Sequence, residues 1–126
     1  MTKILVIEDH PTSRELMTYL LRCAGHDLVE TGDGREGFDL ARTHRPDLVI
    51  SDVQLPGMNG FEIVAAIKRD PALAGTPVVA VTASAMSGDR ENIIAAGFDD
   101  YLSKPIDPET FAQQIARHLP PQRSSR

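Results

Sequence analysis

Three acidic residues occupy positions where the sequence could do chemistry: Glu8 and Asp9 directly follow one apolar run, and Asp52 directly follows another. These runs, residues 4–7 and 47–51, are short and rich in β-branched residues, which is typical of strands buried on both faces. If the two strands are parallel neighbours, the three carboxylates meet at one edge of a sheet. Two like charges about 4 Å apart repel each other by roughly 4 kcal/mol at an effective dielectric constant of about 20. A cluster this unfavourable indicates a site that holds a cation or performs chemistry.

Two further polar residues follow later apolar runs: Thr82 ends the run 78–82, and Lys104 comes directly after residues 99–103. Each candidate has an ordinary structural interpretation when it is taken alone. The acids could be solvated loop or turn residues, Thr82 a β-branched strand residue, and Lys104 a surface lysine in an extended dipeptide with Pro105. Their order and spacing on one alternating pattern favour a shared site instead.

Apolar runs and amphipathic segments alternate along the chain. Strands are expected at about 3–8, 27–31, 47–51, 78–82 and 99–103, and helices at about 11–24, 33–44, 60–69, 86–96 and from 107 onward. This alternation with right-handed crossovers gives an α/β fold, a parallel sheet with helices on both faces. In such sheets the functional site lies at the carboxyl ends of the strands, near the point where strand order reverses. The pattern therefore places the acids, Thr82 and the residues after Ser103 around one crevice.

Capping residues mark where several of these helices begin. His10 before Pro11 suits an N-cap followed by proline at the first helical position. Asp33 and Asn59 each stand three residues before a glutamate, which is the spacing of a capping box. Asp107 followed by proline predicts the start of the last helix.

The sequence also predicts part of the core. Leu16, Leu20 and Cys23 fall on one stripe of the first helix, so Cys23 is expected to pack as a small apolar residue. The other side chains expected in the core or on the apolar side of the last helix are Phe61, Phe98, Phe111, Ile115 and Leu119.

Composition bounds the class of protein. The chain has 126 residues, 41% hydrophobic and 25% charged, and fits one globular domain. We expect this domain to span residues 1–119 and residues 120–126 to form a short polar, disordered tail. The formal net charge of −5 argues against nucleic acid as the main ligand. No apolar stretch approaches the roughly 18 residues of a membrane span, and the single cysteine fits a reducing compartment, so a cytoplasmic protein is expected.

Five segments carry a resemblance to a known family: residues 3–9 (KILVIED), 47–52 (DLVISD), 55–60 (LPGMNG), 81–83 (VTA) and 101–105 (YLSKP). With them the chain resembles the receiver domain of two-component response regulators, in particular the stand-alone regulators of chemotaxis and cell-cycle control. The resemblance covers about residues 3–119. It implies a doubly wound, flavodoxin-like (βα)5 three-layer sandwich with a five-stranded parallel sheet of order 2-1-3-4-5.

The resemblance assigns roles to the acids. Asp52 would be the phosphoacceptor, which takes a phosphoryl group from a histidine kinase or a histidine phosphotransfer protein. Glu8, Asp9, Asp52 and the backbone carbonyl of Gln54 would hold Mg²⁺, a cation that prefers oxygen ligands and binds through a few carboxylates together with a phosphate. Glu8 stands where aspartate is more common, so its longer side chain could reach the metal through water.

The resemblance also implies a two-state switch. Thr82 would hydrogen-bond one phosphoryl oxygen and Lys104 would pair with another, so both would take part with Asp52 in the transfer chemistry. Movement of Thr82 would let Tyr101 rotate inward and change the surface of the fourth helix, fifth strand and fifth helix. The bond between Lys104 and Pro105 is commonly cis in this family, which a sequence cannot show.

We therefore expect a single-domain response regulator that controls a downstream protein and is a monomer or weak dimer. It would not be an enzyme, apart from slow loss of its own phosphoryl group. Two alternatives stay open: an intermediate of a phosphorelay, or a receiver domain cut from a hybrid kinase or larger regulator. A phosphohydrolase of the haloacid dehalogenase type is remote, because Gln54 stands where those enzymes need a second acid.

Overall fold

The computed structural model of the chain describes residues 2–83 and 87–119, and the side chains of residues 87–89 lie outside this description. The tail expected at residues 120–126 also lies outside the described residues, as does the first residue of the predicted helix 86–96.

Within the described part of the chain, five parallel strands form one sheet in the order β2-β1-β3-β4-β5, and five helices alternate with them. The strands are β1 (Lys3–Ile7), β2 (Asp27–Thr31), β3 (Leu48–Asp52), β4 (Val78–Thr82) and β5 (Asp100–Ser103). The helices are α1 (Pro11–Cys23), α2 (Gly34–His44), α3 (Gly60–Arg69), α4 (Ser87–Ala95) and α5 (Phe111–Ala116). The predicted doubly wound α/β fold and its strand order are confirmed.

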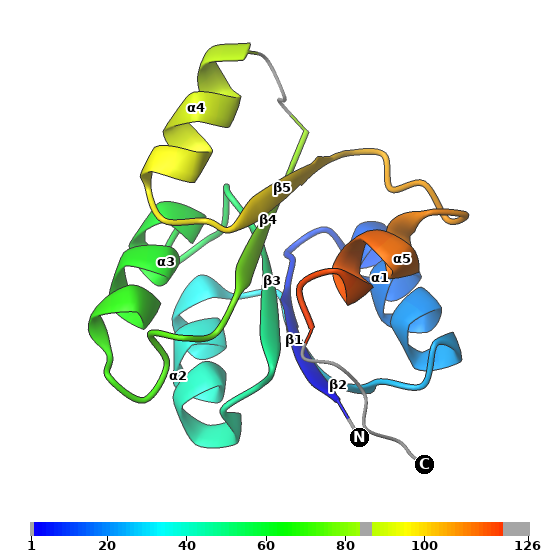
Figure 1. The fold of residues 1–126 in the computed structure, drawn as a ribbon, viewed down its shortest axis with the longest axis horizontal. Helices are drawn as coiled ribbons and strands as arrows, with labels where there is room; N and C mark the ends of the chain where they lie inside the picture. Colours follow the sequence, from blue (N-terminus) through cyan, green and yellow to red (C-terminus); the bar gives the residue numbers. More distant parts are fainter. Residues whose placement is uncertain (1, 84–86, 120–126) are drawn as a thin grey trace.

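The helices cover both faces of the sheet: α1 and α5 lie on one side, and α2, α3 and α4 on the other (Figure 1). Side chains alternate between the faces along each strand. In β1, Leu5 and Ile7 belong to the core under α2 and α3, whereas Ile4 and Val6 belong to the core under α1 and α5. The continuous apolar runs of the sequence exist because both faces of these strands are buried.

The register of the sheet aligns the carboxyl ends of its strands. Ile7 of β1 pairs with Thr31 of β2 and with Ser51 of β3, and Thr82 of β4 pairs with Ser103 of β5. The residues that follow these ends therefore emerge along one edge of the sheet. This edge carries the polar residues that the sequence predicts to form the site.

The buried stripe of α1 differs from the predicted one. Met17, Thr18 and Leu21 are buried, whereas Cys23 is exposed. One residue along a helix turns the side chain by about 100°, so the stripe through Met17 and Leu21 points at the sheet and Leu16 is only half-buried at its margin. The prediction that Cys23 packs in the core is wrong.

Phe61 was also predicted in the core, and this too is wrong. Its side chain remains 37% exposed at the start of α3. The ring packs edge-to-face against Phe98, with 6.1 Å between the ring centroids. Phe98 itself is buried, as is Phe111, so the core predicted from the remaining phenylalanines is confirmed.

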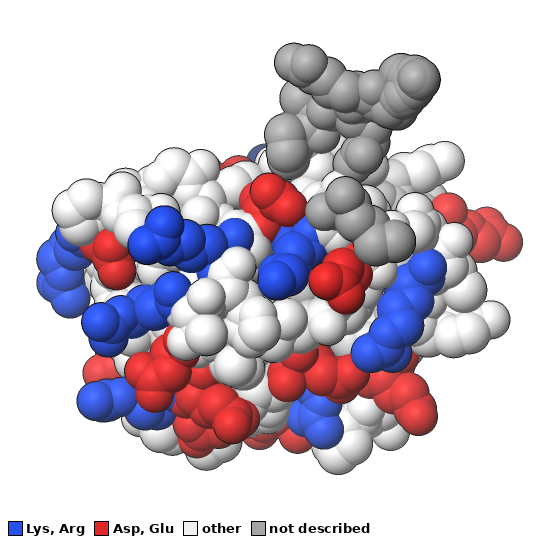
Figure 2. All heavy atoms as spheres, turned by 90° about the horizontal axis from the view of Figure 1, so that it is seen from below, with Lys and Arg blue, Asp and Glu red and all other residues white. Residues whose placement is uncertain are grey.

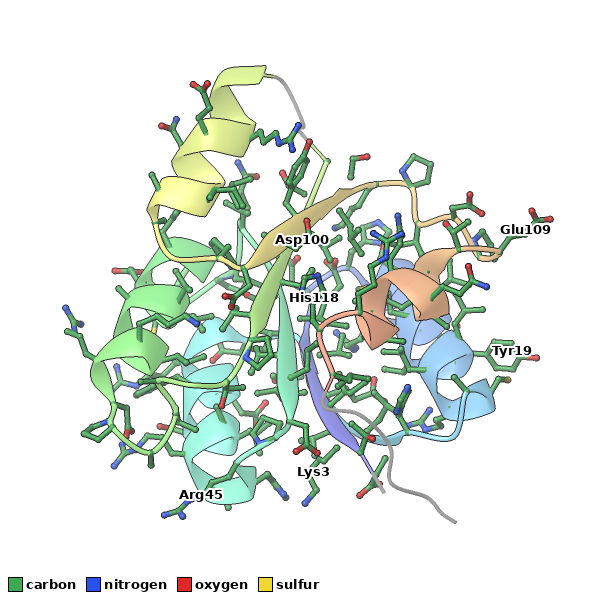
Figure 3. The ribbon with its side chains drawn as sticks, viewed as in Figure 1. Lys3, Tyr19, Arg45, Asp100, Glu109 and His118 are labelled. Carbon is green, nitrogen blue, oxygen red and sulfur yellow. The ribbon has the colours of Figure 1, made fainter. Side chains whose placement is uncertain are left out.

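The last helix begins later than predicted. Residues 108–110 form a turn, and α5 starts at Phe111, whose N–H donates to the carbonyl of Asp107. The Asp107 side chain accepts a hydrogen bond from the Glu109 N–H, so it caps the turn instead of a regular helix. After the helix ends, His118 Nε2 lies 2.9 Å from Asp100 Oδ2, and Figure 3 shows the two side chains close together beside the sheet. This contact joins the residues that follow α5 to β5.

Two of the predicted helix starts carry side-chain caps. Asn59 and Glu62 form a complete capping box on α3, and Asp33 accepts from the Glu36 N–H at 2.8 Å on α2. The Glu36 side chain contacts Thr31 instead of returning to Asp33. Among the described residues, no helix is both long enough and apolar enough to span a bilayer.

Removing the capping side chain of Asn59 tests the start of α3. Asn59→Ala leaves an N–H of the first helical turn without its acceptor, and we expect the free energy of unfolding to fall by about 1 kcal/mol. Urea unfolding followed by circular dichroism measures this loss. His10→Ala is the matched control, because His10 occupies the N-cap of α1 without a side-chain hydrogen bond. An equal loss in both variants would contradict the capping role.

A second test concerns the loop that follows β3. The Gly34 N–H donates to the carbonyl of Pro56, and a Cβ at Gly34 would lie only 1.6 Å from the Met58 carbonyl oxygen. The Gly34→Ala backbone must move, so we expect it to lose about 1–3 kcal/mol of unfolding free energy in the same urea experiment. At Gly75 an added Cβ meets nothing within 4 Å, and Gly75→Ala should be neutral or slightly stabilised. Equal effects of the two substitutions would contradict the close approach of loop and helix.

Candidate functional site

A cavity of about 510 Å³ opens at the carboxyl edge of the sheet. Each of the central strands supplies one of its polar side chains: Asp9 follows β1, Asp52 ends β3 and Thr82 ends β4. Lys104, directly after β5, and Gln54, in the loop after β3, also line it. The structure therefore brings together the predicted residues that depend on strand ends.

The three acids differ sharply in their exposure to solvent. Glu8 is completely buried and Asp52 is 8% exposed, whereas Asp9 is exposed. One carboxylate oxygen from each residue lies within 4.8 Å of the other two. The repulsion expected from the sequence is therefore present in the fold, and between Glu8 and Asp52 it acts where little water screens it.

A lysine ammonium lies between two of the acids. Lys104 Nζ is 2.8 Å from Glu8 Oε1 and 2.9 Å from Asp52 Oδ2. Burial opposes the charge of Lys104, but the contacts with Glu8 and Asp52 outweigh it, so the net effect raises the pKa of the amine. Lys104 stays cationic at neutral pH and offsets part of the acidic repulsion. The peptide bond between Lys104 and Pro105 is cis.

The Glu8 carboxylate is held by the backbone of His10 as well as by Lys104. Its Oε2 accepts a hydrogen bond from the His10 N–H at 3.0 Å. Burial raises the pKa of the Glu8 carboxyl, the contacts with Lys104 and His10 oppose this rise, and Asp52 adds to it; the net shift is upward. Glu8 Oε1 is a buried oxygen that accepts no hydrogen bond among the described residues, although Lys104 is within ion-pair distance.

Asp52 is fixed on both sides of its carboxylate. Oδ1 accepts from the Gln54 N–H at 3.2 Å, and Oδ2 accepts from Lys104. The backbone of Asp52 is also closely packed, because a Cβ at Gly60 would lie 2.4 Å from the Asp52 carbonyl oxygen. The carboxylate therefore faces the cavity in one defined orientation.

One predicted residue lies outside this constellation. Tyr101 of β5 is half-buried and does not line the cavity. The guanidinium of Arg90, on α4, lies over its ring at 5.5 Å from the centroid. Tyr101 is thus in contact with α4. Both belong to the surface of the fourth helix, fifth strand and fifth helix that is expected to change.

The donor set suits a hard divalent cation. It combines the exposed carboxylate of Asp9, the carboxylate of Asp52 and the buried carboxylate of Glu8, whose Oε1 lies 2.8 Å from Lys104 Nζ. Oxygen ligands of this kind, next to an open cavity that admits water, are what Mg²⁺ and similar ions use. These acidic residues could bind a metal ion.

Sequence reasoning missed one residue that contacts this cluster. Arg14 of α1 donates from Nη1 to the backbone carbonyl of Glu8 at 2.7 Å. Its position, five residues after Asp9 on a predicted amphipathic helix, is a weak signal, because an arginine there usually makes only surface contacts.

Comparison with known proteins places the chain in a family. The sequence matches the response regulator receiver domain over residues 4–116. It is 41% identical over 120 residues to the polar-differentiation response regulator DivK of Brucella ovis, covering 94% of this chain and 98% of that protein. It is 40% identical over 116 residues to DivK of Brucella anthropi, covering 92% of this chain and 94% of that one.

Solved structures agree with the sequence match. The chemotaxis response regulator CheY4 of Vibrio cholerae superposes with a TM-score of 0.89 at 33% identity, covering 94% of this chain and 99% of that chain. The receiver domain of the sensor histidine kinase PA1611 from Pseudomonas aeruginosa, with a magnesium ion coordinated in its active site cleft, gives a TM-score of 0.84 at 31% identity and covers 92% and 95%. The fold, the acidic edge of the sheet and these matches together show that the chain belongs to the response regulator receiver domain family.

Proposed function

We propose that Asp52 is the phosphoacceptor of a single-domain response regulator, in a family in which phosphorylation and partner switching are typical. The observation that carries this proposal is the Asp52 carboxylate, which faces the cavity with Lys104 on one oxygen and the Gln54 N–H on the other. A histidine kinase or a histidine phosphotransfer protein is the proposed donor. Members of this family are generally not classed as enzymes, and the chain would take the phosphoryl group onto its own side chain.

The proposed transfer needs little from the protein beyond position and charge. An oxygen of Asp52 attacks the phosphorus of a phosphohistidine donor. A P–O bond forms as the P–N bond breaks, and the donor's imidazole nitrogen leaves with the electron pair and takes up a proton. Lys104 would pair with one negatively charged oxygen of the phosphoryl group, and the Thr82 hydroxyl at the end of β4 would donate a hydrogen bond to another.

Mg²⁺ is the proposed cofactor, held by Glu8, Asp9, Asp52 and the backbone carbonyl of Gln54. Its contribution is positive charge against the phosphoryl oxygens during transfer. Support comes from the oxygen-rich donor set and from the magnesium ion in the cleft of the related PA1611 receiver domain. Asp9 is the most available of the three carboxylates, because it is exposed, whereas Lys104 lies beside both Glu8 and Asp52.

The proposed output is a change in the surface formed by α4, β5 and α5. When Thr82 moves toward the phosphoryl group, Tyr101 gains room to rotate inward. Rotation would remove its ring from under Arg90, so α4 would lose a contact at the same time. A phosphoryl group acts on such a switch only through its different interaction with the two states.

The proposed target of this surface is another protein. The net charge of −5 supports protein partners over nucleic acid. Figure 2 views the molecule from the edge of the sheet opposite to the cavity, where acidic and basic side chains are interspersed. An intermediate of a phosphorelay would use the same site, and that alternative therefore stays a prediction. The monomeric or weakly dimeric state and the cytoplasmic location also stay predictions.

Labelling with a small phosphodonor tests the role of Asp52. With acetyl phosphate and Mg²⁺, the wild-type chain should gain one phosphoryl group by intact-mass measurement, and Asp52→Asn should gain none, because the amide is not nucleophilic. Asp39→Asn, at an exposed acid of α2 outside the cavity, is the matched control and should be labelled like the wild type. Equal labelling of Asp52→Asn and the wild type would disprove the assignment.

Linkage between metal binding and folding tests the cation site. A ligand at ten times its dissociation constant adds about 1.4 kcal/mol to the free energy of unfolding. Mg²⁺ should therefore stabilise the wild type and Asp39→Asn in urea unfolding but have little effect on Asp9→Asn. With EDTA in place of Mg²⁺, Asp9→Asn should be at least as stable as the wild type, because one repelling charge is gone. If the free energy of unfolding of the wild type does not change with Mg²⁺, the proposal is contradicted.

A further inference from the structure

Arg14 connects the acid pair to the far edge of the sheet. Its Nη1 donates to the Glu8 carbonyl at 2.7 Å, and its Nε lies 3.4 Å from Glu30 Oε1 on β2. Arg22, two turns further along α1, reaches the other oxygen of Glu30 at 3.2 Å. Two arginines of one helix thus share one glutamate, but only Arg14 continues to the backbone of the acid pair.

The contact with Glu8 completes a set of restraints on that residue. The Glu8 N–H donates to the Thr31 carbonyl at 3.0 Å, and the Glu8 carboxylate is held by the His10 N–H and by Lys104. Arg14 holds the remaining polar group, the carbonyl. This carbonyl belongs to the peptide that joins Glu8 to Asp9, so its orientation sets the direction in which Asp9 leaves the strand.

The chain leaves space for this guanidinium. A Cβ at Gly32 would lie 2.7 Å from Arg14 Nη1 and 3.5 Å from the Glu8 carbonyl oxygen. A side chain at position 32 would therefore push the guanidinium away from the carbonyl. The contact depends on a glycine at the end of β2 as well as on the arginine.

The exposed ion pair with Glu30 contributes little to stability, since both side chains are partly in water. The short bond from a charged donor to a main-chain carbonyl is stronger and more directional. Its consequence is local: it restrains a peptide plane next to the cavity, where the proposed cation site requires a fixed carboxylate.

We propose that Arg14 is a positioning residue for the metal half of the site: by fixing the Glu8–Asp9 peptide, it holds Asp9 in the orientation that binds Mg²⁺. This inference rests on the proposed function. It does not follow from charge, because a guanidinium near the site repels a divalent cation. Charge alone predicts that removing Arg14 tightens Mg²⁺ binding, whereas positioning predicts that it weakens binding.

Isothermal titration with MgCl₂ measures this difference without any phosphodonor. We expect the dissociation constant of Arg14→Met to rise by about tenfold, a usual effect of removing an outer contact that orients a metal ligand. Arg22→Met is the matched control, because it removes the same charge from the same helix and the same Glu30 but no contact with Glu8. Its affinity should equal that of the wild type.

Gly32→Ala serves as a second variant that keeps every charge and should also weaken Mg²⁺ binding, even if Arg14→Met fails to fold. In acetyl phosphate labelling, the Mg²⁺ concentration for half-maximal rate should rise in both variants, while the rate at saturating Mg²⁺ stays near the wild-type value. An unchanged or tighter dissociation constant in a folded Arg14→Met or Gly32→Ala chain would overturn the positioning role alone. A wild type that binds no Mg²⁺ would overturn the proposed function and this inference together.

Discussion

The repulsion between Glu8, Asp9 and Asp52 is the constraint on which the rest of the site depends. Three carboxylates within 4.8 Å of one another, two of them buried, require positive charge close by. In the described structure Lys104 supplies it from the opposite side of the crevice. The one exposed acid, Asp9, is left facing the cavity. The ammonium of Lys104 thus reduces the repulsion within the folded chain, and the Asp9 carboxylate stays available to a metal ion.

The parallel sheet makes this arrangement possible. Its strands run in one direction, so residues far apart in sequence reach one edge without any loop having to fold back. Asp52 and Lys104 are separated by 52 positions, and their side chains still meet at 2.9 Å. The strands that carry these residues are packed on both faces by apolar side chains. Loop contacts, such as those of Gly34 with Pro56 and Met58, then fix the backbone beside the site.

Features that depend on strand ends could be predicted from the sequence, because β-branched runs and their polar ends are local patterns. The α/β fold and the meeting of Asp9, Asp52, Thr82 and Lys104 belong to this class, whereas the strand order came from the resemblance to the receiver domain family. Features set by rotation about a helix or by partial packing could not. The buried stripe of α1 runs through Met17, one residue from the predicted stripe, and Cys23 is exposed. The contact of Arg14 with a carbonyl depends on tertiary approach, which no spacing encodes.

Because β5 lies at the edge of the sheet, the strand before Lys104 is held by fewer neighbours than the strands that carry the acids. In the described structure β5 pairs with β4 alone, whereas β1 and β3 each lie between two neighbours. The acids are therefore anchored in the interior of the sheet, and Lys104 is carried by a strand with one row of hydrogen bonds. An edge strand can shift without breaking a ladder on its outer side. The crevice thus lies between acids carried by strands that are paired on both sides and a lysine that follows a strand paired on one side.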